Sequence, residues 1–211
     1  MNDKILIGIN KVSGKQIVVD ARSLSVCLVV GGWASGKNVW LNGLCAQLKS
    51  ETSSEYAYLD VNDKKDLPTV NKPDRILSGA EQCLKALSEY AELAEQRSKQ
   101  LEPSSDRLVI HIEGHDLVYF NKEHYFAVIS KLARYAKTAN INVLLVVSRY
   151  HSEEIPMEYI KLCTLKAVFA GDTYATNSRK LGFKTMHLGP FEKQIELEGS
   201  CFVIKATHNE K

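Results

Sequence analysis

The stretch that most constrains the fold of this chain runs from Ser25 to Val39 and reads SVCLVVGGWASGKNV. It joins a short apolar run, typical of a buried strand, to a glycine-rich turn that ends at Gly36 and Lys37. The pattern G-x-x-x-x-G-K-[ST], which forms phosphate-binding loops between a strand and a helix, matches at both of these residues and at Gly31. The match fails at its last position, where Asn38 replaces the hydroxyl residue. The segment therefore predicts a phosphate-binding loop whose metal position is altered.

The predicted loop has a direct physical basis for binding phosphate. Successive backbone N–H groups in such a turn point inward and form a nest for anions, and the helix that begins near Lys37 adds the positive end of its dipole. Glycine allows the positive φ and the close backbone approach that phosphate binding requires. Lys37 would contact the outer phosphates of ATP, and Asn38 replaces the hydroxyl that normally holds its Mg²⁺. The alternative is a strand-to-helix turn with chance glycines and a surface lysine.

The predicted phosphate-binding residues form one uninterrupted segment: Gly31, Gly32, Trp33, Ala34, Ser35, Gly36, Lys37, Asn38 and Val39. Trp33 is unusual at the tip of such a loop. It either packs against neighbouring loop residues or contacts a nucleotide or an adjacent domain.

Length and composition restrict the class of protein. The 211 residues suit one large domain or two very small ones, and we expect a single domain over residues 1–211. The net charge is +2, from 27 basic and 25 acidic residues, and no long basic run calls for nucleic acid. Five cysteines without a C-x-x-C pair are typical of buried thiols in a reducing compartment. Without a recognisable signal peptide or membrane-spanning run, we expect a cytosolic domain.

Apolar runs alternate with helical patterns along the chain, which predicts an α/β fold with a mostly parallel sheet and helices on both faces. The first two strands should form an N-terminal hairpin around residues 13–15, and polar sequence at residues 62–73 should form a loop. In the first helix, Val39, Trp40, Leu44 and Leu48 should form the apolar side. The predicted strands are residues 5–9, 16–20, 26–30, 56–59, 108–112, 141–147, 165–170 and 201–204, and the predicted helices are 37–49, 80–101 and 126–137.

A second candidate site follows the strand at residues 108–112, in the segment LVIHIEGHDL. In phosphate-loop ATPases a strand next to the loop strand ends in an acidic pair, of which one acid orients magnesium through water and the other polarises the attacking water. Glu113 stands at the first position and Gly114 at the second, so the catalytic carboxylate is missing. His115 and Asp116 are the nearest groups that could take a proton. The alternative is that Glu113 is a capping or salt-bridged acid at a strand end.

A third candidate site is the end of the strand at residues 141–147, where a polar side chain commonly senses the terminal phosphate. This chain places Ser148 and Arg149 there. Serine is short and would reach phosphate poorly. Arg149 either serves the nucleotide of a neighbouring subunit or, as we favour, pairs with an acid such as Glu153 or Glu154.

The order of these features resembles the FtsK/SpoIIIE family of hexameric motor ATPases. The resemblance covers nearly the whole chain, and it is carried by the segments GINKVSGKQIVVDARSLSVCLVVGGWASGKN, YLD, YAKTANINVLLVVSRYHSE and LEGSCFVIK. It implies a P-loop NTPase fold of the RecA-like type. Within the family the chain is most similar to the last ATPase-like domain of the EssC-type coupling ATPases of the type VII secretion system of Firmicutes.

The resemblance implies binding of ATP and Mg²⁺ with weak or absent hydrolysis, because Asn38, Gly114 and Ser148 depart from the active pattern. It implies a cytoplasmic domain excised from a membrane-anchored parent protein, so that membrane contact arises only through that parent. Implied partners are neighbouring ATPase domains, hexamer subunits and small helical secreted substrates, with no nucleic acid. Two alternatives stay open: an active translocation motor acting on protein or DNA, and a scaffold domain without nucleotide.

Overall fold

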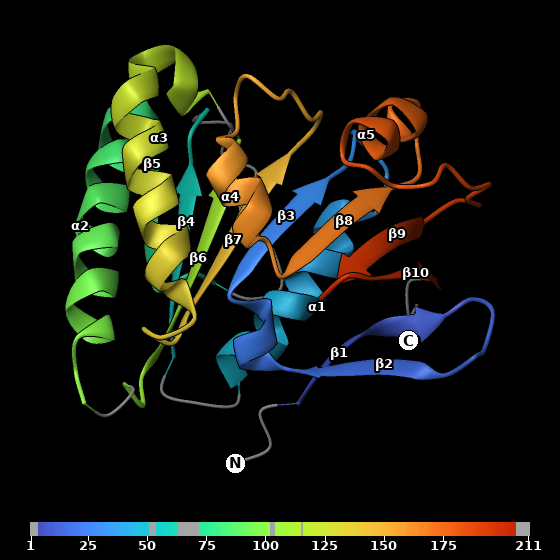
Figure 1. Cartoon of the computed structure of the whole chain (residues 1–211), viewed down its shortest axis with the longest axis horizontal. Helices are drawn as coiled ribbons and strands as arrows, with labels where there is room; N and C mark the ends of the chain where they lie inside the picture. Colours follow the sequence, from blue (N-terminus) through green and yellow to red (C-terminus); the bar gives the residue numbers. More distant parts are fainter. Residues whose placement is uncertain (1–3, 51–53, 63–71, 102–103, 115, 206–211) are drawn as a thin grey trace.

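A computed structural model describes residues 4–50, 54–62, 72–101, 104–114 and 116–205 (Figure 1). Within these residues ten strands form one sheet, in the order β2-β1-β10-β9-β8-β3-β7-β6-β4-β5. Most of the predicted loop at residues 62–73 lies outside the described residues, and so does His115.

A block of parallel strands forms the larger part of the sheet and confirms the predicted fold class. In spatial order its members are β8 (Leu165–Phe169), β3 (Val26–Val30), β7 (Ile141–Val147), β6 (Arg107–Glu113), β4 (Ser54–Asp60) and β5 (Arg75–Ser78). Because parallel strands end at the same edge, the segments that follow β3, β6 and β7 meet there. Since β7 pairs with both β3 and β6, the expectation that the acid-bearing strand lies next to the loop strand is wrong.

The remaining strands extend the sheet as an antiparallel wing. The predicted hairpin is present as β1 (Lys4–Asn10) and β2 (Gln16–Asp20), and it pairs through β1 with β10 (Ser200–Lys205). In turn, β9 (Glu192–Leu197) joins β10 to β8. The final predicted strand therefore belongs to this wing, and not to the parallel block that the alternation of strands and helices suggested.

Helices cover both faces of the sheet, as predicted (Figure 1). On one face lie α2 (Ala80–Ser98), α3 (Leu117–Ala136), α4 (Met157–Leu162) and α5 (Tyr174–Lys180). The other face is covered by α1 (Lys37–Ser50) and a short 3-10 turn, η1 (Ala21–Leu24). No helix among the described residues has the length and apolar character needed to cross a membrane.

Two details of helix patterning differ from expectation. In α1 the buried apolar side chains include Leu41, Leu44 and Leu48, whereas Val39 is 67% exposed. Val39 lies in the first turn of α1, where Asn38 is exposed as well, so the buried side of the helix begins after this turn. Helix α3 begins well before the predicted residue 126, and a non-helical backbone at Asn121 interrupts it. Its first turn contains exposed aromatic residues, so the apolar residues there do not follow the spacing of an amphipathic helix.

The prediction that the cysteines are buried thiols holds for only some of them. Cys27, Cys45 and Cys83 are buried, Cys163 is intermediate and Cys201 is exposed. Cys201 lies at the start of β10, where the first two residues of the strand are both exposed.

Candidate phosphate-binding site

The predicted loop connects β3 to the first turn of α1, as the sequence motif requires. Its start is tied to the sheet, because Gly31 N–H donates to the carbonyl oxygen of Val147 at 3.1 Å. A Cβ atom on Gly31 would lie 2.8 Å from both the Cβ of Phe169 and the Oγ of Ser35, so only glycine fits. Gly36 has a φ of +82°, a conformation that side chains rarely allow. Both motif glycines are therefore required by this backbone.

The loop lines one cavity of about 520 Å³ together with residues that lie at or near the ends of several strands. It is lined by Gly31, Gly32, Trp33, Ala34, Ser35, Gly36, Lys37, Asn38, Val39, Tyr58, Asp60, Glu113, Ser148 and Phe191. The volume falls in the range of small-molecule sites, roughly 300–1,000 Å³. All nine predicted loop residues, Glu113 and Ser148 come together here, whereas Arg149 does not line the cavity.

A buried hydroxyl group in the loop is evidence that the loop binds a ligand such as phosphate. The Oγ atom of Ser35 is buried and has no hydrogen-bond partner in the described part of the chain. Buried polar atoms in native proteins normally have a partner, so an unpaired hydroxyl facing a cradle needs an explanation. A phosphate oxygen would accept its hydrogen bond.

Lys37 and Glu113 form the central ion pair of the cavity. Lys37 Nζ donates to Glu113 Oε1 at 2.9 Å, although the two residues stand 76 positions apart. The second carboxylate oxygen lies 3.1 Å from His111 Nε2, and His111 Nδ1 lies 3.1 Å from the hydroxyl of Tyr56. The chain of contacts thus runs from the loop lysine to the buried core. Both carboxylate oxygens of Glu113 already have partners.

The environment of Glu113 keeps its carboxylate ionised. Burial raises its pKa, but the hydrogen bond and charge of His111, together with Lys37, outweigh burial and lower the pKa to about 2. The salt-bridged role that the sequence left open is therefore present in the structure. A role in orienting magnesium stays a prediction, because it would require Lys37 to turn from this carboxylate to a phosphate.

Gly114, at the catalytic-base position, has a backbone that disfavours any side chain. Its φ is +102°, and a Cβ atom there would lie 3.1 Å from Nδ2 of Asn62. Asp116, the nearest described alternative, lines an adjoining cavity of about 240 Å³ with Asp60, Asn62 and Glu113. Within the described residues no group of three or more His, Cys, Asp or Glu side chains is arranged to hold a metal.

Sequence reasoning missed Tyr58, Asp60 and Phe191 as cavity residues. Asp60 is 1% exposed and stands opposite Glu113 in the register of β4 and β6. The sequence did contain an indication of Asp60, because an acid that ends a buried strand, at the edge of the sheet where the loop lies, is a candidate site residue. Phe191 had no comparable signal, since it lies far along the chain in a turn before β9.

The expected ion pairs of Arg149 do not form. Its side chain is exposed, and it makes no ion pair with Glu153 or Glu154 in the described structure. Instead, Glu154 accepts a hydrogen bond from the hydroxyl of Tyr119. A role for Arg149 towards a neighbouring subunit stays a prediction.

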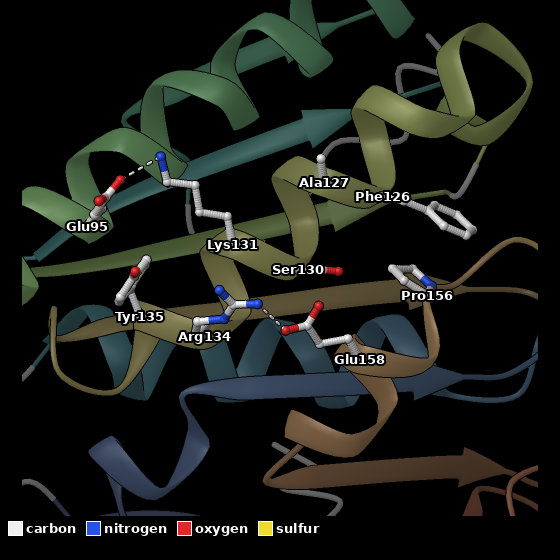
Figure 2. Close-up of a pocket in the computed structure, with 9 residues that line it drawn as sticks. All are labelled: Glu95, Phe126, Ala127, Ser130, Lys131, Arg134, Tyr135, Pro156 and Glu158. Atoms are coloured by element: carbon white, nitrogen blue, oxygen red, sulfur yellow. Dashed lines mark hydrogen bonds and ion pairs between the residues drawn. The ribbon is translucent and has the colours of Figure 1, made fainter.

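A second hollow, of about 550 Å³, lies between α2, α3 and α4, on the face of the sheet that these helices cover (Figure 2). Its cations are already paired within the hollow, as Lys131 contacts Glu95 at 2.6 Å and Arg134 contacts Glu158. It contains no glycine loop and no helix start comparable to that of α1. The cavity at the loop is therefore the better phosphate site.

Comparison with known proteins supports the fold. No family model matches the chain, and no curated protein matches it by sequence. Among solved structures, ATPases 2 and 3 of EccC from Thermomonospora curvata, in complex with a signal sequence peptide, align over 99% of this chain with a TM-score of 0.74 and 14% identity. ATPases 2 and 3 of EssC from Geobacillus thermodenitrificans align over 99%, with a TM-score of 0.73 and 14% identity.

The conjugation coupling protein TcpA of pCW3, with ATPγS, aligns over 97% of this chain, with a TM-score of 0.72 and 14% identity. The chain spans 41%, 46% and 66% of the EccC, EssC and TcpA structures, respectively. At these identities the likeness establishes the fold. The predicted similarity to FtsK/SpoIIIE-type ATPases, and to EssC in particular, is therefore confirmed at the level of fold.

Proposed function

We propose that this chain is an ATPase-like module of a type VII secretion coupling protein, which binds ATP with Mg²⁺ and hydrolyses it slowly or not at all. The observation that carries the proposal is the single cavity in which the whole glycine loop, Lys37 and Glu113 come together. The fold supports it, because a solved structure of the same fold, TcpA, has ATPγS.

The residues present suit a nucleotide with its metal ion. The loop N–H groups, Ser35 and Lys37 would hold the phosphates. Mg²⁺ would arrive with the nucleotide and would neutralise phosphate charge, with Asn38 offering an amide oxygen and Glu113 acting through water. To contact phosphate, Lys37 must leave the carboxylate of Glu113 and pair with a phosphate oxygen instead. Glu113 therefore competes with the nucleotide for Lys37 and becomes available as Lys37 leaves.

Replacing Lys37 by alanine is expected to weaken binding of ATP with Mg²⁺ by roughly 10- to 150-fold, because a charge-assisted contact contributes about 1.5–3 kcal/mol. Isothermal titration calorimetry measures the affinity directly. Glu113→Gln is the complementary variant. With EDTA present it should bind ATP about 2- to 10-fold more tightly than the unchanged protein, since Lys37 is released from its ion pair.

The matched control is Lys49→Ala, at the other end of the same helix, where the lysine pairs with Asp74 at 2.8 Å. It should leave ATP affinity unchanged. Equal affinity for the unchanged protein and Lys37→Ala would refute the site. If the unchanged protein does not bind ATP at all, the scaffold alternative is favoured. In that case ATP with Mg²⁺ would also leave the melting temperature unchanged in a thermal shift assay.

In the parent assembly, we propose that the module regulates the recognition or export of small helical secreted proteins. Structures of the same fold contain several ATPases in one chain, and one of them is in complex with a signal sequence peptide. Neighbouring ATPase domains of the same polypeptide, or hexamer subunits, are the proposed contacts, and the parent is proposed to be membrane-anchored with this module in the cytoplasm. A net charge of +2 gives little support for a DNA motor, because DNA binding relies on many Lys and Arg contacts.

Deleting this module from the full-length parent protein is expected to abolish or sharply reduce export of its small helical substrates. Secretion into the medium, measured against total cellular substrate, gives the readout. Lys37→Ala in the full-length protein separates two roles of the module. Lost export on deletion but normal export for Lys37→Ala would keep a binding role and reject nucleotide control, whereas normal export after deletion would contradict the role itself.

A further inference from the structure

The turn that leads into β9 places an aromatic residue where glycine is the rule. Glu192 N–H donates to the carbonyl oxygen of Gly189 at 3.2 Å, which closes a β-turn with Pro190 and Phe191 at its centre. Phe191 has a φ of +59°. Turns with proline second and a positive φ third normally have glycine or asparagine at the third position, and a bulky residue there is an outlier.

Neighbouring contacts hold this strained turn in place. One carboxylate oxygen of Glu192 accepts from the N–H of Gly189 at 2.8 Å and from Nζ of Lys11 at 2.7 Å. Glu192 is also the first residue of β9, so the turn is fastened to the sheet. A strained backbone persists only where its surroundings over-determine it, and such strain concentrates at ligand sites. Phe191 therefore calls for a functional reason.

The ring of Phe191 lies beside the phosphate loop. A Cβ atom on Gly36 would lie 3.0 Å from Cδ1 of Phe191, so the ring packs over the bare backbone of the loop. Phe191 is 49% exposed and lines the same cavity as the loop. Val39, in the first turn of α1, lines this cavity too and is largely exposed. An apolar surface with one aromatic face thus adjoins the anion cradle.

We propose that Phe191 is the platform on which the base of a bound nucleotide stacks, with Val39 as a second apolar contact and the phosphates on Gly31 to Asn38. The proposal rests on the nucleotide site proposed above and adds a base subsite to it. Stacking on a ring face accepts every base, because each base has a π-face. The site therefore takes GTP nearly as tightly as ATP.

The test compares ATP with inorganic tripolyphosphate, which offers the phosphates without a base, by calorimetry. Phe191→Asn removes the ring but keeps a residue that tolerates positive φ, so the turn should fold, as thermal melting will verify. It should weaken ATP binding about 5- to 150-fold and leave tripolyphosphate binding unchanged. Phe191→Tyr should retain ATP affinity. Phe120→Ala, an exposed phenylalanine on α3 outside the cavity, is the matched control.

The outcomes separate the base platform from the nucleotide site. Equal ATP affinity for Phe191→Asn and the unchanged protein would overturn the platform and leave the phosphate site standing. Loss of both ligands in Phe191→Asn would overturn it too, because Phe191 would then support the loop and not the base. Failure of the unchanged protein to bind either ligand would refute the proposed nucleotide site itself.

Discussion

ATP turnover by this chain is expected to be roughly 10²- to 10⁴-fold slower than in a comparable domain with a carboxylate at the position of Gly114, which is the usual contribution of a general base. Asn38 adds to the loss, since it replaces the hydroxyl that holds magnesium. Phosphate release from rigorously purified protein measures the rate. If the unchanged protein releases phosphate rapidly and Lys37→Ala abolishes this release, another group must act as the base. The variant Asp116→Asn would then show whether the nearest described candidate is that group.

Restoring the acid with Gly114→Glu is not expected to restore turnover. The φ of +102° at this position is rarely compatible with a side chain, and the new Cβ would crowd Asn62. The strained backbone should lower the free energy of unfolding by about 1–3 kcal/mol. Chemical denaturation measures that change, and a phosphate-release assay measures turnover. A stable Gly114→Glu protein with rapid turnover would show that only the carboxylate was missing.

Replacing Lys193 by methionine is expected to raise the free energy of unfolding at pH 7 by about 3 kcal/mol. Lys193 is 0% exposed, and its Nζ has no hydrogen-bond partner among the residues that the structure describes. Burial lowers its pKa from 10.5 to about 8, and at 1.36 kcal/mol for each pH unit this difference is about 3 kcal/mol. Methionine has similar length and no charge to bury.

The stability difference between Lys193→Met and the unchanged protein should depend on pH in a defined direction. Below pH 8 Lys193 is protonated in both the folded and the unfolded protein, so the difference is constant. Between pH 8 and 10.5 the unfolded chain binds more protons at this residue, so the cost of burying its charge disappears and the difference shrinks. Comparing two proteins cancels the thiols and tyrosines that titrate in the same range.

Chemical denaturation at pH 7 and pH 10 provides the measurement, with Lys4→Met as the control at an exposed lysine in β1. The ring centroids of Trp40 and Phe169 lie 5.2 and 5.3 Å from Nζ of Lys193, and both stabilise the cation. If Lys193→Met is less stable than the unchanged protein at pH 7, these ring contacts outweigh the cost of burial.

The elements that could be predicted are those with a strong local pattern. The strands Val26–Val30 and Ile141–Val147 have the predicted bounds, because both are continuous apolar runs that parallel strands buried on both faces require. In contrast, β9 was missed, since its buried residues include Lys193 and Gln194 and do not form an apolar period. The short elements β5, α4 and α5 were missed because they span too few residues to show a period.

By itself, the sequence determined the α/β class, the position of the glycine-rich loop and the absence of a carboxylate at Gly114, because each depends on residues close together in the chain. The tertiary structure alone decided which distant residues join the loop. Strand order places β7 between β3 and β6, brings Glu113 within 2.9 Å of Lys37 and sets Phe191 against Gly36. Such contacts follow from strand pairing and packing across the whole sheet, which local periodicity does not encode.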